Sequence, residues 1–138
     1  MEHKTLLDML SEANEIVKRL SFDDVNKLIE SGNTLIIDVR EESEVLAGRI
    51  KNSIHIPRGL IEFSFELGSP NNPGNANADT NLVFYCAGGY RSVIAISILR
   101  KKGYSGMINI TEGFNEILKS DLNENCYNSP SEASCNNI

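Results

Sequence analysis

Residues 82–99 read Leu-Val-Phe-Tyr-Cys-Ala-Gly-Gly-Tyr-Arg-Ser-Val-Ile-Ala-Ile-Ser-Ile-Leu: an apolar run, a glycine-rich turn and a helical pattern. The run 82–85 is typical of a strand buried on both faces, and residues from 92 onwards favour a helix. A turn between such elements directs backbone N–H groups and the positive end of the helix dipole at one point. It is therefore predicted to hold an anion, either the thiolate of its cysteine or a charged group bonded to it. The residues of this loop are Cys86, Ala87, Gly88, Gly89, Tyr90 and Arg91.

The alternative is that Cys86 is only structural. A cysteine after a β-rich run is more often a small buried apolar residue than a reactive group. A purely structural turn needs one glycine at most and has no need of an arginine five residues after the cysteine. Here Gly88 and Gly89 stand together, and both are expected to take the positive φ that turns successive amides inward. We therefore interpret Cys86 as a nucleophile.

Three motifs along the chain resemble the rhodanese family of sulfurtransferases. The first, Cys86-x-x-Gly89-x-Arg91, resembles the active-site loop of that family. The second lies within residues 36–57, where an Asp-x-Arg strand end, an acidic helical turn and an Ile-Pro pair follow one another. The third, at residues 103–114, is similar to the family's closing Gly-Gly and aromatic segment. The residues that carry the second motif are Asp38, Arg40, Glu44, Gly48, Ile50, Ile54, Ile56 and Pro57.

The chain departs from the family pattern at four positions outside the loop. Arg49 stands in place of the usual histidine, and Ser53 in place of the usual alanine. Glu112 replaces the first glycine of the closing pair, and Phe114 replaces a frequent tryptophan. These changes bear on local packing rather than on the chemistry of the loop.

Helices and strands are predicted to alternate along most of the chain. Apolar residues recur at three- and four-residue steps over 4–19, which indicates an amphipathic helix. Ser21 is placed to cap the next helix and Gly32 to end it. This alternation predicts an α/β fold with a central parallel sheet covered by helices on both faces. The other helices are expected over 41–47, 59–65, 92–102 and 113–119, and the strands over 34–38, 53–56, 82–85 and 106–110.

Three segments follow from this pattern. Residues 1–20 are predicted to form an N-terminal helix, residues 21–119 a rhodanese-like domain, and residues 120–138, rich in Asn and Ser, a mobile tail. The N-terminal helix is expected to pack on its own domain, with dimerisation as the alternative. Residues 68–81 are rich in Asn, Pro and Gly and are predicted to form an exposed loop.

Ligands of parallel sheets gather at the carboxyl ends of the strands. Asp38 and Arg40 follow one predicted strand and Cys86 follows another, so we expect them at one rim. We interpret Asp38 and Arg40 as supporting the loop rather than reacting. The alternative is that they only tie the rim together, with Arg40 bridging Glu41 or Glu44 in a partly exposed ion pair.

The composition of the chain restricts the cellular compartment and the binding partners that are expected. The 138 residues suit one domain, and the net charge of −6 with a pI near 4.9 argues against nucleic acid or an anionic membrane as partner. No stretch has the apolar length of a membrane span, and the N-terminus lacks a signal-peptide pattern. Three separated cysteines form no disulfide framework, which favours a reducing, cytoplasmic compartment. Cys126 and Cys135 are expected outside the mechanism, and no metal-ligand spacing joins the cysteines and histidines.

The loop predicts covalent sulfur transfer in two steps. The Cys86 thiolate attacks the outer sulfur of a donor and becomes a persulfide, and an acceptor then removes that sulfur. No metal or organic cofactor is needed. The resemblance implies thiosulfate or a low-molecular-weight persulfide as donor, and cyanide, a small thiol or a protein thiol as acceptor.

The residues within the loop bear on the choice of substrate. Residues 87–90 carry no positive charge, so only Arg91, with Arg40 or Arg58, is expected to meet the sulfonate end of thiosulfate. A persulfide donor is therefore favoured. Tyr90 is expected either to form a wall of the pocket or to pack beside the helix.

Two other function classes are alternatives to sulfur transfer. Related phosphatases and arsenate reductases carry five residues between cysteine and arginine, whereas this loop has four. The shorter loop suits one sulfur atom better than a tetrahedral oxyanion. A non-catalytic rhodanese-like binding module is the other alternative, and retention of Cys86 counts against it.

Overall fold

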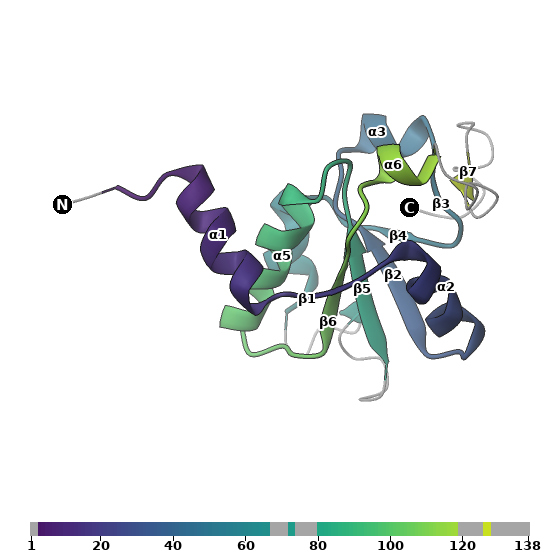
Figure 1. Cartoon of the computed structure of the whole chain (residues 1–138), viewed down its shortest axis with the longest axis horizontal. Coiled ribbons are helices and arrows are strands. Elements are labelled where there is room, and N and C mark those ends of the chain that lie inside the picture. Colours follow the sequence, from purple (N-terminus) through teal and green to yellow (C-terminus); the bar gives the residue numbers. More distant parts are fainter. Residues whose placement is uncertain (1–2, 67–71, 74–79, 119–125, 128–138) are drawn as a thin grey trace.

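A sheet of five parallel strands forms the centre of the protein (Figure 1). The computed structural model describes residues 3–66, 72–73, 80–118 and 126–127. The strands of the sheet are β1 (Lys18–Leu20), β2 (Thr34–Asp38), β4 (Ile54–His55), β5 (Asn81–Tyr85) and β6 (Met107–Ile110). Their order across the sheet is β1-β6-β5-β2-β4, so β5 is central. It pairs with β2 in register as far as Asp38 and Tyr85, which brings the carboxyl ends of both strands together.

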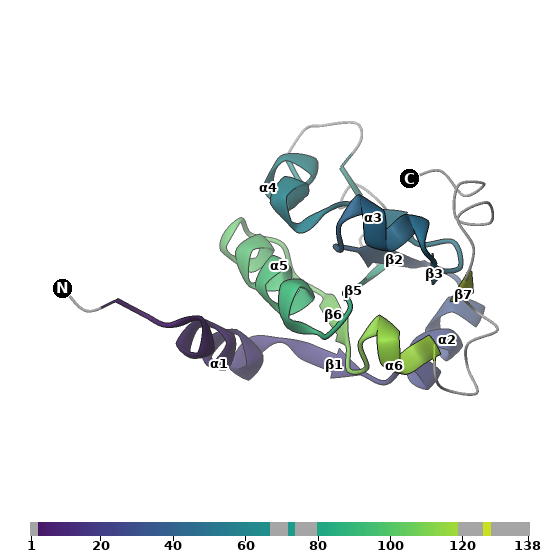
Figure 2. The same cartoon turned by 90° about the horizontal axis from the view of Figure 1, so that it is seen from above.

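Helices cover both faces of this sheet, which confirms the predicted α/β fold (Figures 1 and 2). The first face packs against α1, α4 and α5, and the second against α2 and α6. The helical segments are α1 (Leu6–Ile16), α2 (Phe22–Glu30), α3 (Glu42–Leu46), the 3-10 turn η1 (Arg58–Leu60), α4 (Ile61–Ser64), α5 (Tyr90–Lys101) and α6 (Phe114–Leu118). As predicted, the Ser21 hydroxyl accepts a hydrogen bond from the Asp24 amide at the start of α2, and Gly32, at φ 86°, follows its end.

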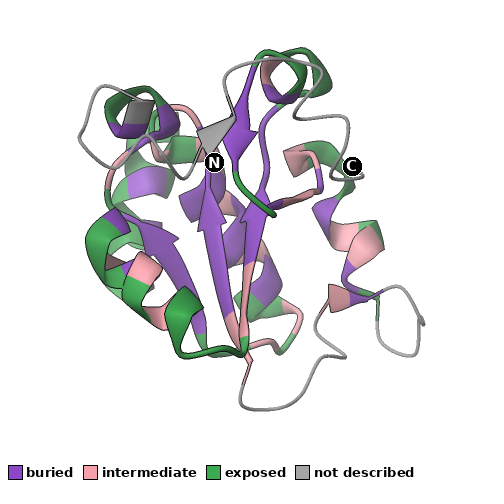
Figure 3. Ribbon diagram, turned by 90° about the vertical axis from the view of Figure 1, so that its right-hand side faces the viewer, coloured by how far each residue is buried: buried purple, intermediate pink, exposed green. Residues whose placement is uncertain are grey.

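Successive side chains of β5 enter different apolar clusters. Phe84 and Cys86 belong to the cluster on the α5 side, and Val83 and Tyr85 belong to the cluster on the α2 and α6 side. A strand covered on both faces has this arrangement because its side chains alternate. Figure 3 shows buried strands between helices whose outer surfaces are exposed.

The N-terminal helix is shorter than its sequence pattern predicts. It begins after Thr5, whose hydroxyl accepts a hydrogen bond from the Asp8 amide at 3.1 Å, and it ends at Ile16. The prediction of helix through residue 19 is wrong, because residues 18–20 pair with β6 as β1. Strand pairing here outweighs the helical spacing. The helix packs against α5 with Ala13 buried, in agreement with docking on its own domain.

Two short strands were missed by the sequence analysis. The strands β3 (Arg49–Ile50) and β7 (Cys126–Tyr127) form an antiparallel pair, so part of the predicted mobile tail lies in a strand. The rest of that tail and most of the predicted loop at 68–81 fall outside the described residues. Among the described helices, none has both the length and the apolar character needed to cross a membrane.

Candidate active site

Cys86 lies directly after β5 and is buried, with 1% of its surface exposed. Its Sγ accepts a hydrogen bond from the Gly89 amide at 3.0 Å. The hydroxyl of Ser92, which is fully buried in the first turn of α5, lies 3.5 Å from the same sulfur and donates to it. Two donors from the strand-to-helix turn therefore converge on one sulfur atom.

The N-terminus of α5 lies behind this sulfur. Gly89 is the N-cap residue and has φ 90°, a left-handed conformation that strains residues with a side chain. No side chain caps this helix end, and the first N–H groups of a helix have no partner within the helix. Together with the helix dipole, they favour negative charge at the position of the sulfur.

The two loop glycines differ in conformation. Gly89 takes the predicted positive φ, but Gly88 does not, so that part of the prediction is wrong. A Cβ added at Gly88 would lie 3.7 Å from the Tyr90 ring, which is ordinary van der Waals contact. One left-handed residue is enough to turn the chain from β5 into α5.

We expect Gly89→Ala to impair the loop and Gly88→Ala to leave it intact. An alanine at φ 90° costs about 1–2 kcal/mol of strain, which the loop can relieve only by moving its amide away from the sulfur. The measurement is the rate at which iodoacetamide alkylates Cys86 in each variant. We expect the rate to change severalfold in Gly89→Ala and to stay at the wild-type value in Gly88→Ala. Equal rates in both variants would contradict this assignment of the turn.

Arg91 is held by a carboxylate from another part of the chain. Its guanidinium forms two bonds to Glu44 of α3, at 2.6 and 2.9 Å. The alternative stated from the sequence was an ion pair between Arg40 and Glu41 or Glu44. In the structure, Glu44 binds Arg91 instead. The hydrogen bonds from Arg91 lower the pKa of Glu44 to about 2, and Glu44 in turn raises the pKa of Arg91.

This ion pair predicts a pH-dependent contribution to stability. The pKa of Glu44 is lowered from 4.5 to about 2 on folding, so the contribution is fully present above 4.5 and is lost as the pH falls through about 2. Both side chains are about one-third exposed, so solvent screening limits the contribution to about 1 kcal/mol. We expect Glu44→Gln, which keeps a capping side chain, to lower the free energy of unfolding at pH 7. The difference should shrink towards pH 2.

Urea unfolding at several pH values measures this difference. The matched control is Glu42→Gln, because Glu42 is an exposed glutamate on the same helix. A Glu44→Gln effect of the same size at pH 7 and near pH 2 would show that the ion pair is not its cause.

Asp38 and Arg40 form a buried ion pair at the end of β2, with 0% and 3% of their surfaces exposed. The alternative, a partly exposed pair between Arg40 and Glu41 or Glu44, is thus wrong. The Arg40 guanidinium contacts both Asp38 oxygens at 2.8–3.1 Å and donates to the Gly48 carbonyl at 2.8 Å. The Tyr85 hydroxyl donates to Asp38 at 2.6 Å and accepts from the Ile50 amide at 3.0 Å. Burial and the neighbouring Asp38 carboxylate raise the pKa of Tyr85 well above 10.0.

Two contacts connect this cluster to the Cys86 loop. The Arg40 guanidinium carbon lies 4.2 Å from the centre of the Phe114 ring, and the Phe114 amide donates to the Cys86 carbonyl at 2.9 Å. Gly113 packs directly on the loop, since a Cβ added there would lie 1.9 Å from the Ala87 carbonyl oxygen. The segment after β6 therefore fixes the backbone of the loop.

The remaining predicted residues lie nearer the surface. Tyr90 is 63% exposed with its ring beside Gly88, so it borders the loop rather than packing into the core. Arg58 donates its amide to the Val39 carbonyl, and its guanidinium lies 3.9 Å from Glu62. No described hydrogen bond joins the Arg58 side chain to the loop. The structure thus brings Asp38 and Arg40 to the loop through Phe114, and it places Arg58 beside another surface.

The match to a known family covers the whole of this arrangement. Residues 21–120 match the rhodanese-like domain, which includes Asp38, Glu44, the Cys86 loop and Gly113. The chain belongs to the rhodanese-like domain family.

Relatives of this rhodanese-like chain differ in length and in the activity that they carry. The tRNA uridine(34) hydroxylase of Prochlorococcus marinus (strain MIT 9215) is 36% identical over 97 residues, covering 69% of this chain and 31% of that protein. The chain thus spans less than a third of the length of that relative. The human thiosulfate:glutathione sulfurtransferase is 28% identical over 108 residues, covering 74% of this chain and 94% of that protein.

A solved structure supports the fold. A protein of unknown function from Rhodopseudomonas palustris CGA009, described as a possible tyrosine phosphatase, has a TM-score of 0.73 and 31% identity. The similarity covers 84% of this rhodanese-like chain and 90% of that one.

Two residues of the site, Ser92 and Gly113, were not assigned a role from the sequence, and Glu44 was considered only as a partner of Arg40. Ser92 donates to the sulfur, Glu44 holds Arg91, and Gly113 contacts the loop backbone. The signal for Ser92 was its place one residue after the loop, within the first turn of the predicted helix. Glu44 and Gly113 stood in the rhodanese motifs, but no local pattern showed which residues they would meet.

Proposed function

We propose that this rhodanese-like chain is a sulfurtransferase in which Cys86 carries a persulfide. The observation that carries this proposal is the Cys86 sulfur, which accepts hydrogen bonds from Gly89 and Ser92 at the uncapped N-terminus of α5. Such a position stabilises a sulfur anion before and after it gains a second sulfur. The human relative, a thiosulfate:glutathione sulfurtransferase, favours the same chemistry.

The reaction divides into two displacements at sulfur. The Cys86 thiolate attacks the outer sulfur of the donor, a new S–S bond forms, and the bond from that sulfur to the rest of the donor breaks. The leaving group takes the electron pair and departs as sulfite from thiosulfate or as a thiolate from a persulfide. An acceptor then attacks the outer sulfur and restores the Cys86 thiolate. Cyanide leaves as thiocyanate, and a thiol leaves as a persulfide.

We infer a distinct role for each residue of the site in these steps. Cys86 is the nucleophile and the leaving group, and the amides of residues 87–91 surround the transferred sulfur. Ser92 donates to the sulfur each time the thiolate is released. Arg91, held by Glu44, braces the start of α5 and places a positive charge close to the loop. No step requires a metal or an organic cofactor.

The charge distribution favours a persulfide donor over thiosulfate. Residues 87–90 are uncharged, and the Arg91 guanidinium is already bound to Glu44 by two bonds. A sulfonate group at the loop therefore meets less positive charge than it does in a loop with its own arginine or lysine.

The three separated cysteines suit a reducing compartment, and we propose that the reaction takes place in the cytoplasm.

The same contacts weigh against the other two function classes. A phosphatase needs its loop arginine to bind the phosphate, whereas Arg91 is engaged by Glu44. Four residues between Cys86 and Arg91 also give a loop suited to a single sulfur atom. A binding module without catalysis does not need a cysteine that accepts an amide and a hydroxyl hydrogen bond.

Intact mass spectrometry tests the proposal. The protein is incubated with thiosulfate and, separately, with glutathione persulfide, and its mass is measured before and after cyanide is added. We expect a gain of one sulfur atom that cyanide removes, with glutathione persulfide reacting faster. A protein that gains no sulfur from either donor would overturn the proposed function.

A further inference from the structure

The helix α5 carries apolar side chains on two sides. Val93, Ile96 and Leu99 face the sheet and are buried. Ile94 and Ile98 lie on the opposite side and are only half-buried. A helix that is apolar all round is normally covered all round, so the outer stripe of α5 lacks part of its cover.

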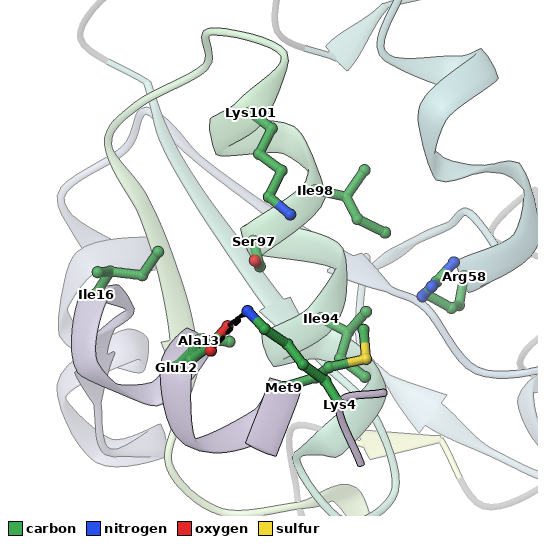
Figure 4. A pocket seen from close by; sticks show the side chains of 10 residues that line it. All are labelled: Lys4, Met9, Glu12, Ala13, Ile16, Arg58, Ile94, Ser97, Ile98 and Lys101. Atoms are coloured by element: carbon green, nitrogen blue, oxygen red, sulfur yellow. Dashed lines mark hydrogen bonds and ion pairs between the residues drawn. The ribbon is translucent and has the colours of Figure 1, made fainter. Parts of the chain in front are cut away.

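A groove of about 320 Å³ lies over this outer stripe (Figure 4). The outer residues of α5 form its floor, α1 forms one wall, and Arg58 of η1 stands on the other side. Its apolar lining residues are Met9, Ala13, Ile16, Ile94 and Ile98. Such a concave, largely apolar surface with charged edges is typical of a binding site.

Exposed apolar side chains gather on the elements around this groove. Nine large apolar side chains are exposed in the described part of the chain, and seven of them lie on α1, on the η1–α4 segment or at the first residue of α5. These seven are Leu6, Leu7, Met9, Ile16, Leu60, Phe63 and Tyr90. A concentration of this kind marks a surface that contacts another protein. It extends well beyond the groove itself, which favours a protein over a small molecule.

The charge of the groove is opposite to that of the whole chain. Its lining contains Lys4, Arg58 and Lys101 but only one carboxylate, Glu12, within a protein whose net charge is −6. Glu12 binds Lys4 at 2.8 Å, and Arg58 lies 3.9 Å from Glu62. Among the described residues, Lys101 forms no salt bridge. The groove is therefore complementary to an acidic segment.

The groove and the Cys86 loop lie along the same side of α5. Tyr90, Ile94 and Ile98 follow at four-residue steps and so lie on one face of the helix. The distance from Tyr90 to Ile98 along the helix axis is about 12 Å. Tyr90 belongs to the loop and is exposed, so a segment bound in the groove needs to extend only about two helical turns to meet the loop.

We propose that this groove docks a protein that exchanges sulfur with Cys86, through a segment with apolar anchors, acidic side chains and a cysteine. The inference rests on the proposed sulfurtransferase function and names the class of its partner. The outer stripe of α5 receives the apolar anchors, Arg58 and Lys101 receive the acidic side chains, and Tyr90 borders the partner's cysteine.

Docking is measured first, without sulfur transfer. A fluorescent peptide with two leucine anchors, flanking Asp and Glu residues and serine in place of cysteine is compared with a twin that carries Lys and Arg instead. We expect the wild-type chain to bind the acidic peptide at least about tenfold more tightly than the basic twin by fluorescence anisotropy. Equal affinities for the two peptides would overturn the inference and would leave the proposed function untouched.

Two variants and a control locate the binding. Lys101→Glu should weaken binding of the acidic peptide about tenfold, and Ile98→Gln should weaken binding of both peptides. Lys51→Glu makes the same charge change in the turn after β3, away from the groove, and should leave the affinities at wild-type values. Equal effects of Lys101→Glu and Lys51→Glu would overturn the inference. A wild-type dimer that Ile98→Gln dissociates in sedimentation velocity would assign the groove to a second copy and also overturn it.

Transfer is measured next with the cysteine forms of both peptides. The Cys86 persulfide is mixed with each peptide, and each rate is divided by the rate of the same protein with cyanide. We expect the acidic peptide to take the sulfur about tenfold faster than its basic twin, and Lys101→Glu to remove this preference. Normal transfer to cyanide with no preference between the peptides would overturn the docking inference alone. Absence of transfer to cyanide as well would mark a failure of the proposed function.

Discussion

We expect Cys86→Ser to abolish sulfur transfer and to leave the fold intact. A serine hydroxyl is not ionised at neutral pH and cannot displace a leaving group from sulfur as a thiolate does, so we expect the turnover rate to fall by at least about three orders of magnitude. The substitution exchanges one buried atom for a smaller one that still accepts hydrogen bonds from Gly89 and Ser92. We therefore expect the midpoint of thermal unfolding to change by only about 4 °C.

Two measurements complete this test. Thiocyanate formation from cyanide gives the turnover rate, and intact mass spectrometry shows whether any sulfur remains attached to the variant. Ser92→Ala provides a graded comparison, because it removes one donor to the sulfur but keeps the nucleophile. Turnover by Cys86→Ser at the wild-type rate would rule out a Cys86 persulfide. Sulfur attached to the variant would point to another residue as its carrier.

Gly113→Ala is expected to disable the loop from a position outside it. The added Cβ would lie 1.9 Å from the Ala87 carbonyl oxygen and 3.0 Å from Gly88 Cα, so the backbone of one segment must move. A displacement of about 1 Å at the loop is enough to lower turnover about 100-fold. The strain is also expected to lower the free energy of unfolding by about 1–3 kcal/mol.

Gly59→Ala is the matched control for this variant. An added Cβ at Gly59 meets no atom within 4 Å, so the same chemical change there should leave both activity and stability at wild-type values. Turnover and urea unfolding are measured for both variants. Wild-type turnover in Gly113→Ala would mean that the loop does not depend on the segment after β6.

Most of the fold could be predicted from local patterns. The strand at residues 82–85, the Ser21 cap and Gly32 at the end of α2 each follow from short-range physics, and the structure has them in place. The helix at the N-terminus was predicted too long, because the pairing of residues 18–20 with β6 joins parts of the chain about ninety positions apart. The strands β3 and β7 were missed for the same reason, since neither has enough residues to form a pattern.

The candidate site, too, could be predicted only where its residues are close together in the sequence. The Cys86 loop could be identified because its glycines, its arginine and the following helix are adjacent in the sequence. The partner of Arg91 could not, because Glu44 is 47 positions away and Arg40 was an equally reasonable partner for it. The burial of Arg40 could not be predicted either, since it depends on Tyr85 at the end of β5 and on Phe114 at the start of α6, both far from Arg40 in the sequence.

The alternation of side chains along β5 affects which substitutions such a protein can accept as it evolves. Cys86 faces α5, while Tyr85, next to it in the chain, faces Asp38 on the other side of the sheet. The residues of the proposed docking groove and the Asp38–Arg40–Tyr85 cluster are thus separated by the backbone of the sheet. Random substitutions confined to α1, η1 and the outer side of α5 should yield many folded, reactive proteins with new preferences. The same number of substitutions around Asp38 and Phe114 should yield few folded and reactive proteins.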